Sequence, residues 1–340
     1  MQTATTLHTT GNDSHPTTPA ATISIVIPCY NEEEVLPWAV GKLQDMLKRL
    51  KAETGTSGQL VLVDDGSKDR TWQLIEHAAQ QHDNVAGIKL AHNEGHQGAL
   101  WAGMQECLGT CDAIVSIDAD LQDDENAIID MTRQFLEGKD IVYGVRKERK
   151  TDTWFKRMSA QAFYRIMQTA DREIIYNHAD FRLMSSRAVG ALMQYPERNM
   201  FLRGMVRQLG FREGYVYYNR TARTAGESKY PLAKMLSFSI DGITSFSNAP
   251  LKFITFAGLT MTLISLLIII YGLYEHFTGK TIEGWTSLMV SVWFIGGVVT
   301  TGVGITGTYI GKIYTEVKRR PRYFVDKRVP LHTSDSSTQK

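Results

Sequence analysis

The sequence predicts an α/β fold, a Rossmann-like and mostly parallel sheet, followed by interfacial helices and two helices that cross a membrane. The first observation is that short apolar runs alternate with helix-periodic segments from residue 23 to residue 144. This alternation is typical of a parallel sheet with helices on both faces. The second observation is that polar clusters follow these runs at the same end. The third is a pair of long apolar runs in the last third of the chain.

Short runs rich in Val and Ile predict the strands, because strands buried on both faces of a sheet lack strict alternation. The predicted strands are Ile23–Pro28, Leu60–Val63, Val85–Leu90, Ala113–Val115 and Ile141–Gly144. Between them, apolar residues recur at the spacing of one helix face. Ser67 or Asp69 is expected to cap the second helix. The predicted helices span 35–50, 70–81, 98–107 and 125–137.

Polar clusters lie where these strands end. In open α/β sheets, ligands bind beyond the carboxyl ends of the strands, so we expect the functional site at this edge. No Gly-x-Gly-x-x-Gly follows the first strand, which disfavours a dinucleotide site. The clusters are Pro28–Glu32, Asp64–Ser67, Asn93–Gln97 and Asp118–Gln122.

The acidic cluster is the candidate metal site. Alternate residues of an extended strand share a face, so Asp118, Asp120 and Gln122 are expected to point the same way. Their carboxylate and amide oxygens suit Mg²⁺ or Mn²⁺, which keep open positions for phosphates. The alternative is a solvated acidic turn without a ligand, and the gathering of polar clusters on one rim weighs against it.

Composition narrows the class of protein. The net charge of +1 gives no field that attracts nucleic acid. The three cysteines form neither a secretory framework nor a zinc set, so they are expected to be reduced. Residues 1–21 are rich in Thr, Ser, Asn and Pro and predict a disordered tail rather than a signal peptide.

Two apolar runs, Phe253–Tyr274 and Trp285–Ile310, are each long enough to cross a bilayer as a helix. The alternative is two buried helices of a soluble core. The loop between the runs holds one basic residue, Lys280, and basic residues are frequent outside them. The positive-inside rule therefore places both termini in the cytoplasm. Glycines that permit close helix contact in the second run are Gly296, Gly297, Gly302, Gly304 and Gly307.

Short motifs along the chain carry a resemblance. They are Ile25–Glu33, Val63–Ser67, Asn93–Gln97, Asp118–Gln122, Tyr143–Arg146, Asp180–Leu183 and Arg223–Tyr230. With them the sequence resembles the inverting glycosyltransferases of family 2 over about residues 22–315. More narrowly it is similar to the polyprenyl-phosphate glycosyltransferases, which include bactoprenol glucosyltransferases and dolichol-phosphate mannose synthases. No Gln-x-x-Arg-Trp motif of the processive members is present, which disfavours polymer synthesis.

The resemblance implies a nucleotide-sugar-binding fold of the GT-A type and roles for individual residues. Asp118, Asp120 and Gln122 would hold a divalent ion on the donor diphosphate. Arg146 would lie between donor and acceptor phosphates, where its planar fork binds phosphate oxygens in pairs. Tyr30 has the alternative of simple packing at a strand end. The implied nucleotide-sugar contacts are Pro28, Tyr30, Glu32, Asp64, Asp65, Asp118, Arg223 and Lys229.

Asp180, Arg146 and Asp120 are the candidate catalytic residues. A lipid phosphate has a second pKa of about 6, so near neutral pH it needs positioning more than deprotonation. Asp180 is therefore either a general base or a group that orients Arg182 or the acceptor. His96 is either a capping or core histidine or part of the site.

The segment 153–167 interleaves apolar and basic residues, a pattern that fits a helix in the membrane interface. Lys156, Arg157 and Ser159 are the candidate lipid-phosphate contacts. The alternative is an ordinary amphipathic core helix. Residues 232–246 have similar spacing and would lie on the inner leaflet.

The two apolar runs and the resemblance together predict a transferase of the bacterial plasma membrane that crosses the membrane more than once. The hypothesis is inverting transfer of a hexose, glucose from UDP-glucose, to undecaprenyl phosphate. The alternatives are UDP-GlcNAc, GDP-mannose or a UDP-aminosugar as donor, or a non-catalytic membrane scaffold. A transporter is disfavoured, and the resemblance suggests a homotetramer. The predicted segments are a tail (1–21), a cytosolic catalytic domain (22–230), a juxtamembrane helix (231–250), a membrane hairpin (251–312) and a basic tail (313–340).

Overall fold

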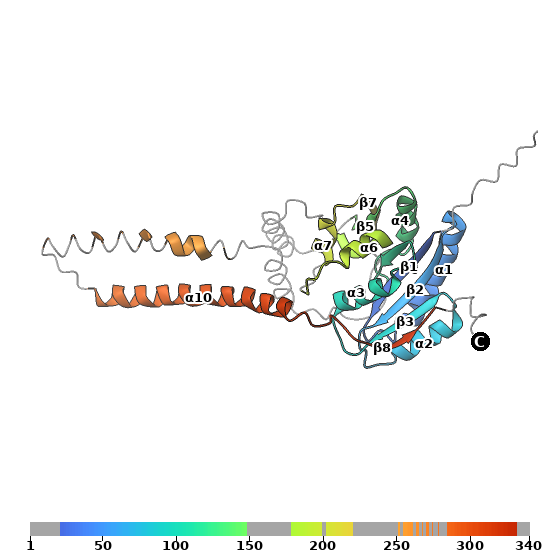
Figure 1. The fold of residues 1–340 in the computed structure, drawn as a ribbon, viewed down its shortest axis with the longest axis horizontal. Coiled ribbons are helices and arrows are strands. Elements are labelled where there is room, and N and C mark those ends of the chain that lie inside the picture. The colour runs from blue at the N-terminus through green and yellow to red at the C-terminus, as the bar shows by residue number, and fades with distance from the viewer. Residues whose placement is uncertain are drawn as a thin grey trace, which may run out of the picture.

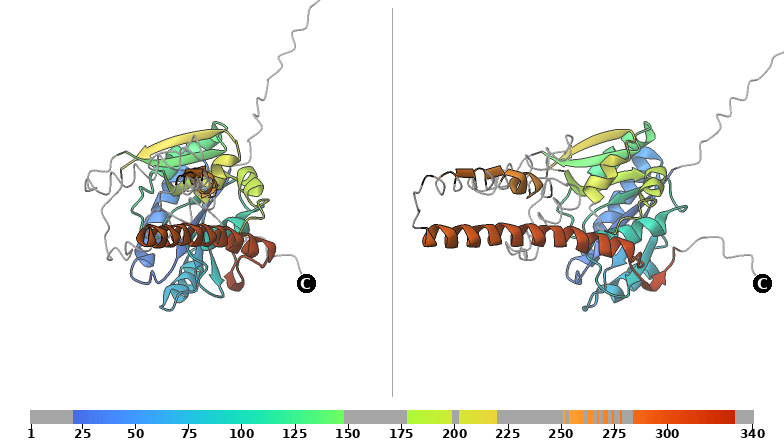
Figure 2. Two further views of the ribbon diagram at one scale, coloured as in Figure 1. Left: turned by 90° about the vertical axis from the view of Figure 1, so that its left-hand side faces the viewer. Right: turned by 60° about the vertical axis from the view of Figure 1, so that its left-hand side comes forward.

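The computed structural model describes residues 21–147, 178–198, 202–219 and 284–331, together with parts of 251–278. An α/β domain occupies one end of the molecule, and a long helix, α10, projects away from it (Figure 1). The chain then returns from α10 to the sheet of the domain (Figure 2).

One eight-stranded sheet forms the centre of the domain, in the order β7-β5-β6-β4-β1-β2-β3-β8. The block β4-β1-β2-β3 is parallel. Strand β6 is antiparallel to both β4 and β5, and β8 is antiparallel to β3. The predicted α/β fold and the five predicted strands are confirmed. The strands are β1 Thr22–Cys29, β2 Ser57–Asp64, β3 Val85–Leu90, β4 Ala113–Ser116, β5 Ile141–Arg146, β6 His178–Ser185, β7 Glu213–Tyr218 and β8 Val325–Val329.

Helices cover both faces of this sheet, as predicted. Alternate residues of β1 point to opposite faces, with Ile25 in one apolar cluster and Val26 in the other. The first cluster takes in α1, α2 and α4, and the second takes in α3, α6 and α7. The helices are α1 Leu36–Thr54, α2 Thr71–Gln81, α3 His96–Cys107, α4 Ala127–Leu136, α6 Ser186–Leu192, α7 Leu202–Gln208 and α10 Trp285–Val317.

The predicted cap of α2 is wrong in detail. Arg70 occupies the N-cap position, and its side chain makes no capping bond. The Ser67 hydroxyl instead accepts the Asn31 N–H at 3.0 Å, in the loop after β1. The Asp69 carboxylate accepts the Thr71 N–H at 3.0 Å. It thus satisfies a donor of the first turn from the residue before the N-cap.

The region predicted as a basic tail, 313–340, is partly built into the fold. Helix α10 continues to Val317, and Val325–Val329 joins the sheet as its edge strand β8. This strand could not be recognised from its residues alone, because three of its five residues are charged and lie exposed. Pairing with β3, far away in the sequence, decides the conformation of this strand.

Among the described residues, one helix is long and apolar enough to cross a membrane, Phe294–Val317 within α10. It contains much of the second predicted span, and its most apolar window is not buried against the domain. The first predicted span, Phe253–Tyr274, is described only in part and stays a prediction. Residues 254–260 of it are helical.

Candidate active site

The polar clusters of the sequence meet at the carboxyl edge of the parallel block. The register pairs Cys29 with Asp64, so the loops after β1 and β2 begin side by side. The Asn31 side chain accepts the Lys68 N–H at 2.9 Å, and Asp65 accepts the Glu94 N–H at 2.7 Å. These bonds join the loops after β1, β2 and β3, which confirms the shared edge.

The two carboxylates after β2 have different surroundings. Asp64 is fully buried, and its Oδ1 accepts the Ser67 N–H at 2.9 Å. Within the described residues its Oδ2 has no hydrogen-bond partner. Burial raises the pKa of Asp65, whose Oδ1 is taken by the loop after β3. Asp64 Oδ2 is therefore a buried acceptor that no described residue satisfies.

Gly66 follows the two carboxylates in a left-handed conformation, with φ of +68°. A Cβ added there would lie 2.8 Å from the backbone of His92 and Asn93. We expect Gly66→Ala to destabilise the protein by about 3 kcal/mol, through backbone strain and the clash together. Gly109 has φ of +81° but no atom within 4 Å of an added Cβ, so Gly109→Ala should cost about 1 kcal/mol. Denaturant titration of both variants measures this difference, and equal losses would contradict it.

The nucleotide-pocket candidates on the β1 loop lie at the same edge. Tyr30 has 44% of its surface exposed, so it is not packed at the strand end as the alternative had it. Pro28 is half-buried at the end of β1, and the half-buried Glu32 donates its N–H to Thr71 Oγ1 at 2.9 Å. Contact of these residues with a nucleotide stays a prediction.

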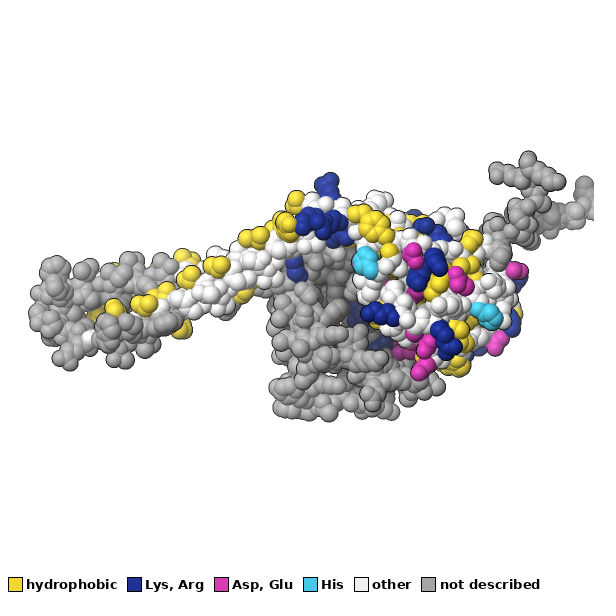
Figure 3. Space-filling model, turned by 90° about the horizontal axis from the view of Figure 1, so that it is seen from below, with side chains coloured by type: hydrophobic (Ala, Val, Ile, Leu, Met, Phe, Trp, Pro, Cys, Tyr) yellow, Lys and Arg dark blue, Asp and Glu magenta, His cyan; other side chains and the backbone are white. Residues whose placement is uncertain are grey.

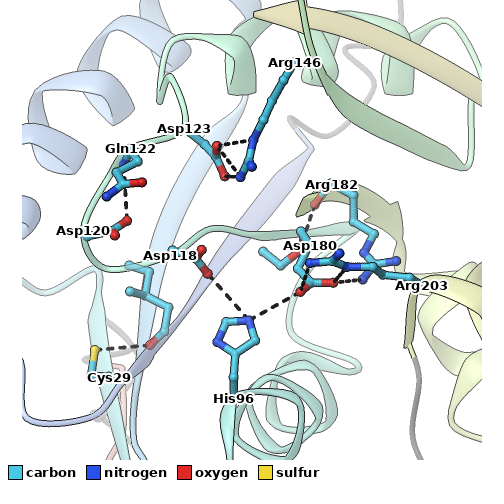
Figure 4. A network of polar contacts seen from close by, with 12 residues as sticks. Cys29, His96, Asp118, Asp120, Gln122, Asp123, Arg146, Asp180, Arg182 and Arg203 are labelled. Atoms are coloured by element: carbon cyan, nitrogen blue, oxygen red, sulfur yellow. Dashed lines mark hydrogen bonds and ion pairs between the residues drawn. The ribbon is translucent and has the colours of Figure 1, made fainter. Parts of the chain in front are cut away.

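The acidic cluster is a turn, not the extended strand that the sequence analysis assumed. Strand β4 ends at Ser116, and the Leu121 N–H bonds the Asp118 carbonyl at 3.1 Å. Leu121 has φ of +42°, and the Gln122 N–H reaches Asp120 Oδ1 at 3.3 Å. Asp120 therefore faces Gln122, while Asp118 faces His96 (Figure 4). The prediction that strand alternation puts the three side chains on one face is therefore wrong.

By chemical type alone, the Asp118, Asp120 and Gln122 oxygens are those that a hard divalent ion prefers. Asp118 is half-buried, and His96 Nε2 is 3.6 Å from its Oδ1. Burial raises the pKa of the Asp118 carboxyl, and neighbouring carboxylates add to the rise while His96 opposes it. The turn thus concentrates negative charge on oxygen donors, which Mg²⁺ or Mn²⁺ prefer. No group of three or more His, Cys, Asp or Glu side chains suited to a metal occurs in the described part of the chain.

Asp180 reaches the site because β6 is inserted between β4 and β5. Its Oδ1 accepts Arg182 Nη2 at 3.1 Å and Arg203 Nε at 3.0 Å, and its Oδ2 accepts Arg203 Nη2 at 3.0 Å. Burial alone would raise the pKa of Asp180, but the two guanidiniums, with His96, hold it well below the ordinary value. An anion stabilised in this way is a poor proton acceptor, so the geometry favours an orienting role over a general base.

Arg146, at the end of β5, is held by a buried carboxylate. Its Nη2 lies 3.1 Å from Asp123 Oδ1, and Asp123 is only 3% exposed. The Tyr218 hydroxyl donates to the same oxygen at 2.8 Å, from β7. This arrangement fixes the guanidinium while leaving part of its surface open (Figure 4).

Several predicted site residues, namely Lys156, Arg157, Ser159, Arg223 and Lys229, lie outside the described residues, so their roles stay predictions. Three further residues of the site were not predicted from the sequence: Asp123, Arg203 and Tyr218. Asp123 was within the acidic run and could have been considered for a site role. Arg203 and Tyr218 belong to no local motif and are brought to the site by α7 and β7.

Comparison with known proteins gives the class of this chain. A protein from Bacillus subtilis named as uncharacterized glycosyltransferase YkoT is 48% identical and covers 89% of this chain and 91% of its own length. A prophage-derived bactoprenol glucosyl transferase from Shigella flexneri is 36% identical, covering 90% of this chain and 97% of its own length. A solved mannosyltransferase from Pyrobaculum calidifontis has a TM-score of 0.43 at 13% identity, covering 77% of this chain and 84% of that one.

An α/β sheet with its polar loops gathered at one edge, and relatives of this kind, define a glycosyltransferase. The chain belongs to glycosyltransferase family 2, whose family model, described as Glycosyl transferase family 2, matches residues 24–193.

Proposed function

We propose that this enzyme transfers a hexose, glucose from UDP-glucose, to undecaprenyl phosphate with inversion at the anomeric carbon. The observation that carries the proposal is the extent of the match to the bactoprenol glucosyl transferase of Shigella flexneri, 97% of that protein. It extends beyond the region that the family model covers. The glucose and the UDP are the finer part of the proposal, and UDP-GlcNAc, GDP-mannose or a UDP-aminosugar are the competing donors.

Asp118, Asp120 and Gln122 would hold Mg²⁺ or Mn²⁺ on the donor diphosphate. The ion would supply positive charge as the diphosphate leaves the sugar. In support of this assignment, burial raises the pKa of the Asp118 carboxyl, and the carboxylates of Asp180, Asp123 and Asp120 raise it further. Asp64, one of whose carboxylate oxygens has no hydrogen-bond partner among the described residues, and the exposed ring of Tyr30 would receive the nucleoside.

The arginines of the site would position the phosphates. An acceptor phosphate oxygen forms a bond to the anomeric carbon, and the bond from that carbon to the diphosphate oxygen breaks. The acceptor phosphate is already largely dianionic near neutral pH, because its second pKa is about 6, so no base is needed. Arg146, fixed by Asp123, would contact the phosphates, as donors placed in advance stabilise charge that develops in the transition state.

The same proposal places the catalytic domain at the cytoplasmic face of the plasma membrane. Helix α10 would be one span, and the segment around residues 251–278 the other. A Cβ added at Gly302 would lie 3.3 Å from Ile254, so the two segments are in contact there. Lys and Arg side chains gather where α10 meets the domain (Figure 3). The exposed Lys318, Arg319 and Arg320 follow α10 and would face anionic headgroups.

The remaining boundaries of the proposal come from the sequence. Residues 1–21 would be a tail, 22–230 the catalytic domain and 231–250 a juxtamembrane helix, with Lys156, Arg157 and Ser159 near the lipid phosphate. Arg223 and Lys229 would close over the donor diphosphate. A homotetramer is suggested by the resemblance alone.

The experiment that tests the proposal incubates membranes containing the full chain with undecaprenyl phosphate and a panel of labelled nucleotide sugars. We expect label in the lipid extract with UDP-glucose, and loss of that label when EDTA removes divalent ions. Label from another donor would correct the sugar. No lipid-linked label from any donor of the panel would contradict the proposal.

A further inference from the structure

The segment 316–329, which runs from the last turn of α10 to the end of β8, forms a strap across the catalytic domain. It leaves the end of α10, passes beside α3 and enters the sheet at β3 (Figures 1 and 2). The Ala91 N–H donates to the Phe324 carbonyl at 2.9 Å, which fixes the strap just before β8 begins.

Three residues of the strap contact the helix α3. The Arg322 guanidinium lies 3.7 Å from the centre of the Trp101 ring, a stacked cation–π contact. The Tyr323 hydroxyl contacts Gln105 Oε1 at 3.1 Å, and Arg328 pairs with Glu106 at 3.1 Å. Trp101 is itself 2% exposed, so Arg322 contacts a ring that is part of the core.

The strap also holds the segment 195–198, which precedes α7. Arg322 Nη2 donates to the carbonyls of Tyr195 and Glu197, both at 2.6 Å. The Glu316 carboxylate accepts the Arg198 N–H, with both oxygens at 2.8 Å. Arg198 Nη2 in turn donates to the Pro321 carbonyl at 2.6 Å. Arg322 thus contacts α3 and the segment before α7 at once.

These two elements carry the groups that surround Asp180. His96, at the start of α3, lies 3.6 Å from Asp118 and 3.8 Å from Asp180. The next residue, Gln97, accepts the Leu202 N–H at 3.2 Å, at the start of α7. Arg203, one residue further along α7, makes the paired contact with Asp180.

We infer that Glu316 and Arg322 are positioning residues of the active site, which set the placement of Arg203 and Asp180 through α3 and the start of α7. The polypeptide that leaves the α10 helix is then a working part of the catalytic domain rather than a passive tether. This inference rests on the proposed function for its effect on turnover, but not for its effect on structure.

Hydrogen exchange followed by mass spectrometry tests the structural half without any assay of activity. In the full chain in detergent, Arg322→Ala should speed amide exchange in 202–208 and 96–107 by at least about tenfold, because it removes two charge-assisted hydrogen bonds and the Trp101 contact, and one such bond alone accounts for about tenfold. Arg328→Ala is the matched control, since Arg328 belongs to the strap, pairs with Glu106 on the surface and contacts neither Trp101 nor 195–198 in the structure described. Unchanged exchange in 202–208 in Arg322→Ala would overturn the inference. If Arg322→Ala does not fold, Arg322→Lys and Glu316→Gln take its place with the same readout.

The effect on turnover is tested by a double-mutant cycle. Arg322→Ala should lower kcat about tenfold per folded enzyme and leave the donor KM unchanged, while Arg328→Ala changes neither. In an Arg203→Ala background, Arg322→Ala should lower kcat by less than about twofold, because coupled residues are not additive. Independent, multiplying effects would contradict a route through Arg203. If no transfer is detected in any variant, the proposed function fails, and the exchange experiment still decides the inference.

Discussion

Asp120→Asn is expected to lower turnover by about 10²–10³-fold, the loss seen when one group that stabilises transition-state charge is removed. Asp120 faces Gln122 across the turn after β4, and the change removes one of the two carboxylates proposed to hold the ion. The measurement is transfer of labelled hexose to lipid at a fixed donor concentration, over a titration of Mg²⁺ and Mn²⁺. The apparent metal affinity should fall along with the rate.

Asp124→Asn is the matched control for this variant. Asp124 belongs to the same acidic run, but its Oδ1 accepts the Asn126 N–H at 3.0 Å and the Asn126 side chain at 2.8 Å, outside the proposed metal set. We expect the control to stay within about twofold of the parent rate, because surface polar substitutions have small effects. Equal, undiminished activity in both variants would favour a site without a metal, and no activity in the parent would favour the scaffold alternative.

Asp180→Asn should reduce the free energy of unfolding by about 3–5 kcal/mol, because removing one partner of a buried pair leaves an uncompensated charge. Arg182 is 3% exposed and would lose its carboxylate partner. Asp45→Asn is the comparison: Asp45 pairs with Lys48 at 2.9 Å and both side chains are 76% exposed, so its loss should cost about 1 kcal/mol or less. Denaturant titration of the full chain measures both.

The effect of Asp180→Asn should depend on pH in one direction. Arg203 and Arg182 hold the folded-state pKa of Asp180 below its ordinary value. Its stabilising contribution is therefore complete above the unfolded value of about 3.9 and is lost as the pH falls through the lower folded value. The stability difference between parent and variant should be constant above about pH 5 and shrink below about pH 4. A difference that grows as the pH falls would contradict the pairing.

The fold could be predicted where periodicity is local. Parallel strands such as Val85–Leu90 and helices such as α4 carry their signal within a few residues, and the structure places them as expected. Strand β7 has an alternating burial pattern with Val216 and Tyr218 inward, which was readable but was not recognised. Strand β8 is exposed and charged at its centre, so only its pairing with β3 defines it.

The site could be predicted where a motif lies at a strand end. It was predicted less well where the interacting residues are distant in the sequence. The carboxyl-edge clusters meet as expected, but the extended geometry of Asp118–Gln122 failed because β4 ends at Ser116 and the chain turns. Asp180, Arg203 and Asp123 could not be related to one another from the sequence. The contact of Asp180 with Arg203 depends on the antiparallel insertion of β6 and on α7, and that of Asp123 with Tyr218 depends on the pairing of β7 with β5.

The most direct test of the account is a product analysis with the purified full chain in lipid bilayers containing undecaprenyl phosphate, UDP-glucose and Mg²⁺ or Mn²⁺. The account predicts one β-linked undecaprenyl-phosphate hexose for each nucleoside diphosphate released, with neither formed when the ion is removed. Release of the nucleoside diphosphate with the sugar appearing only in water, or an α-linked lipid product, would contradict it.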